Sequence, residues 1–118
     1  MSDRGAGCPA EVTPFVAGYV ALVTIHLHLG EVHDLKAKRK ELKSFTEQLR
    51  GRLGVAVAEV DHQDKWQRST VVAAAVSGTA RGAEDLADRI GRFADGRFPD
   101  GVRVEHALAS FDEVSGLG

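Results

Sequence analysis

The chain has 118 residues, a formal net charge of −2 and 43% hydrophobic residues, a composition typical of a globular protein with a single core. It contains no apolar run near the roughly 20 residues that a membrane-spanning helix needs. Cys8 is the single cysteine, so it cannot form an intramolecular disulfide, and no basic segment followed by an apolar one marks a signal peptide. We therefore expect a cytoplasmic protein without a membrane span.

The charges are unevenly distributed along the chain. Residues 34–52 carry seven basic side chains against three acidic ones, a local charge of +4, whereas residues 80–118 carry five against eight, a charge of −3. The protein as a whole lacks the basic field that marks a dedicated nucleic-acid binder. It is instead polarised, with one basic element on a mildly acidic body.

The N-terminal part divides into a tail and a strand. Residues 1–17 are rich in glycine, alanine and proline and show no sustained apolar period, so we expect a flexible tail before a single domain of residues 18–118. From Tyr19 to Leu29, apolar residues at every second position alternate with a set that includes His26 and His28. This period predicts a strand with one buried face.

A helix is expected next. Gly30 breaks the strand and Asp34 can serve as an N-cap. The apolar side chains that follow fall within an arc of roughly 80° at helical spacing, which predicts a helix that packs on a sheet and ends near Gly51 or Gly54. These side chains are Leu35, Leu42, Phe45, Leu49 and Leu53.

The remaining residues predict three strands and a second helix. Residues 55–60 and 70–76 are expected to be strands joined by a polar loop, and the nearly all apolar 70–76 should lie in the centre of the sheet. Residues 102–109 alternate weakly as a fourth strand. The inner stripe of the second helix, which stops within residues 96–101, consists of Ala83, Leu86, Ala87, Ile90 and Phe93.

The resulting element order is βαββαβ. Right-handed crossovers close this order into an α+β ferredoxin-like sandwich, a four-stranded antiparallel sheet with two helices on one face. The same fold hosts many unrelated activities, so it does not define a function.

Four segments resemble the YlxP-like family, a bacterial domain of unknown function numbered 503. They are residues 27–30, 35–39, 57–60 and the distinctive block Gln63-Asp64-Lys65-Trp66-Gln67-Arg68, within a match from about Gly18 to Leu108. The chain departs from the family pattern at the helix cap, where Asp34 replaces the usual serine, and in its N-terminal tail. The resemblance implies a ferredoxin-like fold. Because such genes often neighbour those of a translation initiation factor and a ribosome-binding factor, it also implies a link to ribosome assembly or translation.

The first candidate site is a basic flank beside the apolar stripe of the first helix. Such a flank can follow phosphates and supplies sequence-independent, salt-sensitive affinity for nucleic acid. The alternative is a solvated face in which Lys43 and Glu47 form a weak surface pair. The basic flank consists of Lys36, Arg39, Lys40, Lys43 and Arg50.

The second candidate site is the polar loop before the third strand. An indole and a guanidinium at a hairpin tip can stack on a base or clamp a phosphate. Alternatively, Trp66 covers the sheet edge while Arg68 pairs with a carboxylate and the glutamines satisfy loop backbone groups. The candidate residues of this loop are Gln63, Asp64, Trp66, Gln67 and Arg68.

Metal, cofactor and catalytic sites lack a recognisable motif. His26 and His28 share a strand face, and His106 could approach from the fourth strand, but no further ligand completes a metal site. The sequence contains neither a phosphate-binding glycine loop nor a nucleophile elbow. We therefore expect no metal, no cofactor and no enzymatic activity.

The leading hypothesis is a non-enzymatic binding module that associates with ribosomal RNA or a ribosomal particle. The alternative is a homodimeric structural or regulatory domain, which pairs through the sheet face that the helices leave open. We expect some of the residues Leu22, Ala73 and Ala75 on that face.

Overall fold

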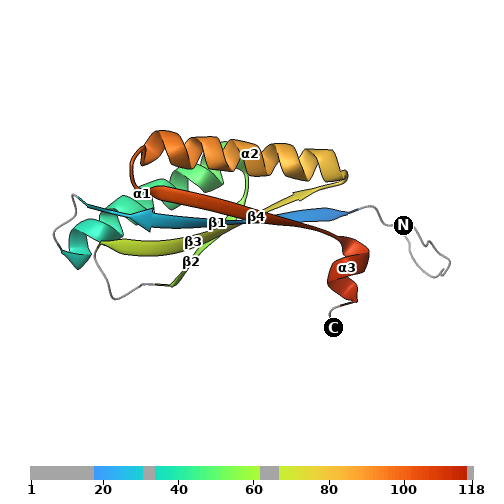
Figure 1. The fold of residues 1–118 in the computed structure, drawn as a ribbon, viewed down its shortest axis with the longest axis horizontal. Helices are drawn as coiled ribbons and strands as arrows, with labels where there is room; N and C mark the ends of the chain where they lie inside the picture. Colours follow the sequence, from blue (N-terminus) through green and yellow to red (C-terminus); the bar gives the residue numbers. More distant parts are fainter. Residues whose placement is uncertain (1–17, 31–33, 62–66, 117–118) are drawn as a thin grey trace.

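The computed structural model describes residues 18–30, 34–61 and 67–116. It contains the predicted elements in the predicted order, followed by a short third helix (Figure 1). The strands are β1 (Tyr19–His28), β2 (Ala56–Asp61), β3 (Arg68–Ser77) and β4 (Val102–Ser110), and the helices are α1 (Leu35–Leu53), α2 (Ala80–Arg97) and α3 (Phe111–Ser115).

The strands form one antiparallel sheet in the order β2-β3-β1-β4. This order, with α1 and α2 packed on one face, is the ferredoxin-like α+β sandwich, and the fold prediction is confirmed (Figure 1). The apolar segment at residues 70–76 belongs to β3, which lies in the interior of the sheet as predicted. Within the described part of the chain, no helix is both long and apolar enough to cross a membrane.

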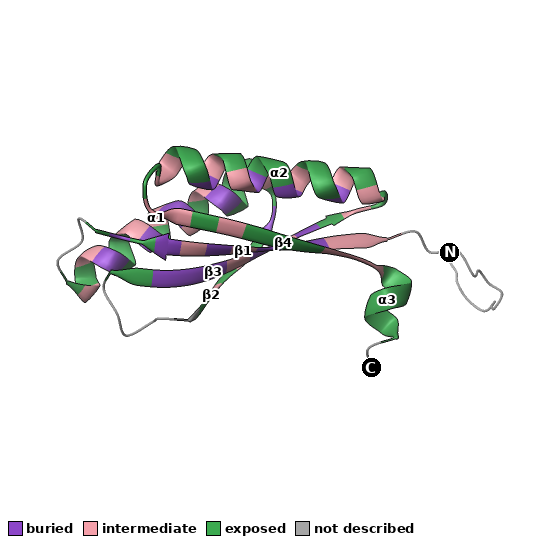
Figure 2. Ribbon diagram, viewed as in Figure 1, coloured by how far each residue is buried: buried purple, intermediate pink, exposed green. Residues whose placement is uncertain are grey.

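The alternation in β1 separates the two faces of the sheet. Ala21, Val23 and Ile25 are completely buried beneath the helices, whereas Leu22 on the opposite face is 47% exposed. Figure 2 shows the same division, with buried residues gathered where strands and helices face each other. The predicted strand period is therefore confirmed, and one face of the sheet carries the core.

The ends of α1 follow from its capping residues. The Asp34 carboxylate accepts a hydrogen bond of 2.7 Å from the Ala37 backbone N–H, which satisfies one of the unpaired donors of the first turn. At the other end, Gly54 adopts a left-handed backbone with φ 65°, a conformation in which glycine has no steric penalty. The helix boundaries lie close to those that the sequence predicts.

Aromatic rings join α1 to α2. The Phe45 ring stacks on Phe93 with centroids 5.8 Å apart and meets Phe98 edge-on at 5.1 Å. Phe45 is fully buried between the helices and the sheet. This cluster fixes the rotation of α1 about its own axis, and so determines which flank of the helix faces solvent.

A buried polar cluster joins α1 to the sheet. Lys38 lies on the buried stripe of α1, only 1% exposed, and its ammonium is 3.3 Å from the Glu59 carboxylate of β2. The hydroxyl of Ser69 in β3 donates a hydrogen bond of 2.6 Å to the same carboxylate oxygen. A charged side chain in this position must be paired because burial removes its hydration. The cluster therefore connects α1, β2 and β3.

Two smaller features of the structure were not predicted from the sequence, although Leu22 does lie on the open face as expected. Ala73 and Ala75 were candidates for the open face, but they are buried in the core, because they pair with Val23 and Ala21 of β1. Residues 111–115, for which no element was predicted, form α3. A reciprocal capping box starts this helix, in which Ser110 and Glu113 each accept a bond from the other's backbone N–H.

The aromatic cluster predicts a large effect of truncating Phe45. Phe45→Ala should lower the free energy of unfolding by about 3–5 kcal/mol, because it empties a fully buried site between two packed layers. The measurement is denaturant-induced unfolding, with Arg92→Ala on the exposed side of α2 as the control. A loss for Phe45→Ala no greater than that of the control would contradict this packing.

The buried polar cluster predicts an asymmetric response. Glu59→Ala should destabilise the fold by about 3 kcal/mol, because it removes a charge partner from a fully buried ammonium. Lys38→Met keeps the packing of the stem and leaves a partly exposed carboxylate, so it should cost about 1 kcal/mol or less. Thermal and denaturant unfolding of both variants measure the difference, and the reverse order would show that Lys38 is not held in this way.

Candidate functional site

The basic flank of α1 defined above is a single surface in the structure. All five of its residues are exposed and lie on the side of the helix away from the buried residues Leu42, Phe45 and Leu49. From Lys36 to Arg50 the helix rises by about 21 Å, at 1.5 Å per residue. The basic flank is therefore a row of cations along most of the helix.

Most cations of the basic flank have no acidic partner among the residues that the structure describes. Within residues 18–30, 34–61 and 67–116, no carboxylate lies within 4.0 Å of the charged groups of Lys36, Arg39, Lys40 and Lys43. The weak Lys43–Glu47 pair that the sequence suggested is thus not formed. Arg50 differs, because its guanidinium donates a 2.8 Å hydrogen bond to the Val57 carbonyl of the edge strand β2.

A shallow depression accompanies the basic flank on the outer surface of α1. Its volume is about 530 Å³. It brings two lysines next to hydroxyl and amide side chains, which are suitable donors for phosphate oxygens. Its lining residues are Lys40, Lys43, Ser44, Glu47, Gln48, Gly51 and Arg52.

The loop candidates are only partly described. Gln63, Asp64 and Trp66 lie outside the described residues. The Gln67 carbonyl accepts a 2.7 Å hydrogen bond from the Leu29 backbone, which joins the start of β3 to the end of β1. Arg68 is exposed and pairs with His28 in the sheet register, so it lies on the face opposite the helices. The structure thus places Arg68 and the basic flank on different sides of the sheet.

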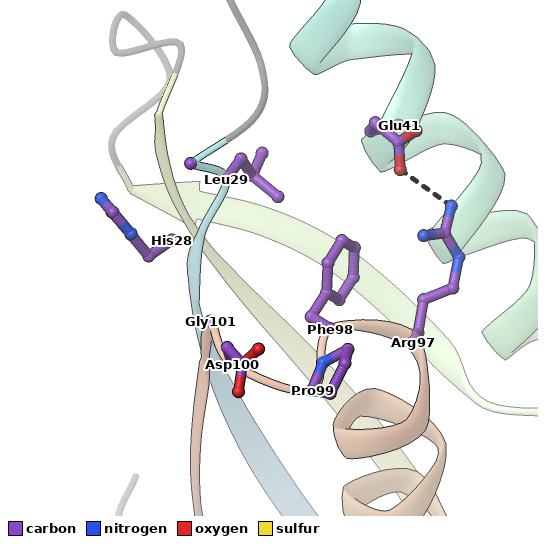
Figure 3. A pocket seen from close by; sticks show the side chains of 9 residues that line it. His28, Leu29, Glu41, Arg97, Phe98, Pro99, Asp100 and Gly101 are labelled. Atoms are coloured by element: carbon purple, nitrogen blue, oxygen red, sulfur yellow. Dashed lines mark hydrogen bonds and ion pairs between the residues drawn. The ribbon is translucent and has the colours of Figure 1, made fainter.

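A cavity of about 630 Å³ lies between the end of β1, α1 and the loop from α2 to β4 (Figure 3). The Arg97 guanidinium donates to the Glu41 carboxylate at 2.9 Å, and its carbon lies 4.9 Å from the centre of the Phe98 ring. This pair connects the end of α2 to α1. Sequence analysis did not single out these residues, because each charge occupies an ordinary surface position in its own helix.

The histidines of β1 and β4 do not converge. His26 hydrogen-bonds to the Glu105 carboxylate at 3.2 Å, and Arg103 donates to the same oxygen at 2.7 Å. The bond from Arg103, and then that from His26, hold the pKa of Glu105 below its usual value. His106 pairs with the core residue Val23, so it lies on the other face. Among the residues described, no three metal-ligating side chains gather.

The buried position of Lys38 was not predicted, although the sequence carries a signal for it. Lys38 precedes Leu42 by four positions and Phe45 by seven, so it falls on the apolar stripe of α1. Glu59 likewise follows Val55 and Val57 at alternate positions of β2. Opposite charges on two facing apolar stripes are a pattern that indicates a buried pair.

Two solved structures resemble this fold at low sequence identity. The designed protein Foldit4 has a TM-score of 0.50 and 17% identity, over 78% of this chain and 96% of its own. SnoaB, a cofactor-independent oxygenase from Streptomyces nogalater, has a TM-score of 0.43 and 14% identity, over 77% of this chain and 90% of its own. These likenesses concern the course of the backbone alone.

The expectation that the chain is not an enzyme is wrong, because the lack of motifs does not exclude enzymatic activity. It was based on the lack of catalytic and cofactor motifs, and the oxygenase just described works without a cofactor. A missing cofactor motif therefore does not exclude an enzyme. The missing motifs therefore do not decide whether this chain catalyses a reaction.

Sequence comparison places the chain in a family. The "Uncharacterized protein YlxP" of Bacillus subtilis (strain 168) is 35% identical over 67 residues, which cover 57% of this chain and 72% of that protein. The profile of the family described as "Protein of unknown function (DUF503)" matches residues 20–106, from the second residue of β1 into β4. The match thus includes α1, α2, β2 and β3 and most of β1 and β4, and the chain belongs to the DUF503 family.

Proposed function

We propose that this protein binds RNA of ribosomal particles in the cytoplasm through the basic flank of α1. The observation that supports this proposal is the row of exposed cations without acidic partners among the described residues. Exposed unpaired cations are surrounded by counterions or bind a polyanion. A helix with this charge distribution is therefore suited to a phosphate backbone.

The spacing of the cations suits several phosphates at once. Lys36, Lys40 and Lys43 are separated by four and three residues, so they rise by about 6 Å and 4.5 Å along one side of α1. Their long side chains can each reach a different phosphate. The contact is then electrostatic and independent of base sequence.

The open face of the sheet is poorly suited to base stacking. RNA-recognition domains of this fold type stack bases on aromatic side chains of the central strands. Within the described lengths of β1 and β3, the open face carries aliphatic residues such as Leu22, Ala74 and Val76 and no phenylalanine, tyrosine or tryptophan. We therefore assign RNA binding to α1 rather than to the sheet.

The anchoring of α1 favours a rigid binding surface. Phe45 holds the helix against α2, and Lys38 holds it against β2 and β3. Arg50, at the end of the basic flank, is bonded to the edge of the sheet. Binding would therefore not require the helix to become ordered, and that entropy cost is avoided.

Reversing three charges tests the proposal. The variant Lys36→Glu, Lys40→Glu, Lys43→Glu alters exposed positions only, so the fold should persist. Binding to ribosomal particles and single-stranded RNA should be lost at low salt. For the unaltered protein, the logarithm of the binding constant should fall with the logarithm of salt concentration by about 0.7 per phosphate contacted. Fluorescence anisotropy and co-sedimentation measure these quantities.

A matched control separates this surface from net charge. Arg81→Glu, Arg89→Glu, Arg92→Glu changes the total charge by the same amount on exposed positions of α2. This control variant should lower RNA binding much less than the triple variant of the basic flank does. If the unaltered protein binds RNA without salt dependence, or if both triple variants lose binding equally, the assignment to the basic flank is wrong.

A further inference from the structure

Two of the exposed large hydrophobic side chains of the described residues, Leu22 and Val76, lie on the sheet face that α1 and α2 do not cover. Leu22 is 47% exposed, Val60 is 53% exposed and Val76 is 74% exposed. Phe111 and Val114 of α3, at the end of β4, are 52% and 46% exposed. Exposed apolar residues that gather in one region, rather than scatter, mark an interaction surface.

The sheet register places Leu22 and Val76 in one continuous apolar patch. Leu22 lies opposite Ala74 on one side and Ala107 on the other. Two residues along β1, Val20 lies opposite Val76 and Ala109. Residues in these register positions share one face. We define the open patch as Val20, Leu22, Ala74, Val76, Ala107 and Ala109.

The third helix extends this surface. Its first backbone N–H, that of Phe111, donates a 2.7 Å hydrogen bond to the Gly18 carbonyl, so α3 begins beside the start of β1. Figure 1 shows α3 projecting from the end of β4 away from α2. The open patch is therefore bordered at this end by a short helix with exposed apolar and acidic residues.

The two ends of the open face carry opposite charges. Asp112 and Glu113 lie in the first turn of α3. Beyond the other end of the open patch, Arg103 lies opposite His26, and Arg68 lies opposite His28. The face thus has an acidic end, an apolar middle and an end with two arginines, two histidines and the carboxylate of Glu105, which Arg103 and His26 bind.

We propose that a second copy of this chain packs face to face on the open patch, related by a two-fold axis that passes near Leu22 and runs across the strands. This axis places the row of Leu22, Ala74 and Ala107 of one copy on the same row of the other, and the neighbouring Val20 row of each copy over the Thr24 row of its partner. From Leu22, the position of Arg103 and His26 is four residues along the strand, or about 13 Å, and Tyr19, next to α3, is about 10 Å in the opposite direction. The axis therefore brings α3 of each copy over the Arg103–His26 row of its partner.

The shape and size of the surface favour this occupant. Leu22 stands between the small residues Ala74 and Ala107, so the two Leu22 side chains can contact each other beside the axis, with room left on either side of them. The four strands span about 19 Å and their residues about 30 Å, a flat footprint near 570 Å² before side-chain relief and α3 are added. Stable interfaces bury about 800 Å² of accessible surface per partner, so the flat strands alone supply about 70% of that area and the rest must come from projecting side chains and α3.

The dimer is independent of the proposed RNA site. The basic flank of α1 lies on the helix side of the sheet, away from the open patch. Face-to-face packing would leave the basic flank of each copy exposed, so one dimer would carry two basic flanks. Dimerisation and RNA binding can therefore fail separately in experiments.

Sedimentation equilibrium of the unaltered chain and of Leu22→Glu tests the dimer. The unaltered chain should be dimeric at micromolar concentration. Leu22→Glu should raise the dissociation constant by about 100-fold or more, because each dimer carries two buried carboxylates that lack partners. Arg92→Glu, a change to glutamate on α2, should leave it unchanged. Val76→Lys provides a second variant at a position so exposed that the monomer should still fold, as checked by circular dichroism.

A charge exchange tests the orientation. Arg103→Glu and Asp112→Lys should each weaken the dimer, and the double variant should regain much of the lost affinity because the cross-interface pair is restored with reversed signs. A monomeric unaltered chain would overturn the proposal and leave the face to a different protein. A dimer that survives both Leu22→Glu and Val76→Lys, or a double variant weaker than either single one, would also overturn it.

Discussion

The two-residue alternation of β1 is the constraint on which the rest of the structure depends. β1 pairs with both β3 and β4, so its register determines which side chains of three strands share each face. Ala21, Val23 and Ile25 select the face on which the helices pack, and a shift by one residue would expose all of them. Because both long helices cover the same face of the sheet, the opposite face, which carries the open patch, remains exposed.

The orientation of α1 follows from that buried face and carries the proposed function. Phe45 and Lys38 are held from different directions, one by rings of α2 and its following loop and the other by a carboxylate of β2. With these two side chains fixed, the cations at the other side of the helix must point away from the core. The same residues thus stabilise the fold and present the basic flank.

Much of this architecture could be predicted from sequence because it rests on local periodicity. The strand of β1, the apolar β3 and the stripe of α1 appear as repeating patterns, and the basic flank follows from helix geometry alone. Pair-specific features were harder to predict. The faces of Ala73 and Ala75 depend on their register with β1, and the link of Glu41 to Arg97 joins residues 56 positions apart. The capping box of α3 and the position of Lys38 were readable, but a five-residue helix and a lone charge on an apolar stripe are weak signals.

A single NMR study of backbone amides tests the central claim, that the protein uses one face of the sheet for its core, the other for self-association and the outer flank of α1 for RNA. Spectra would be recorded over a dilution series and then with added single-stranded RNA. Dilution should shift the amides of Leu22, Val76 and Phe111 and leave those of Lys36, Lys40 and Lys43 in place, whereas RNA should do the reverse. RNA-induced shifts that fall on the open patch, or a patch that does not respond to dilution from a concentration at which the protein associates, would contradict this division of the molecule.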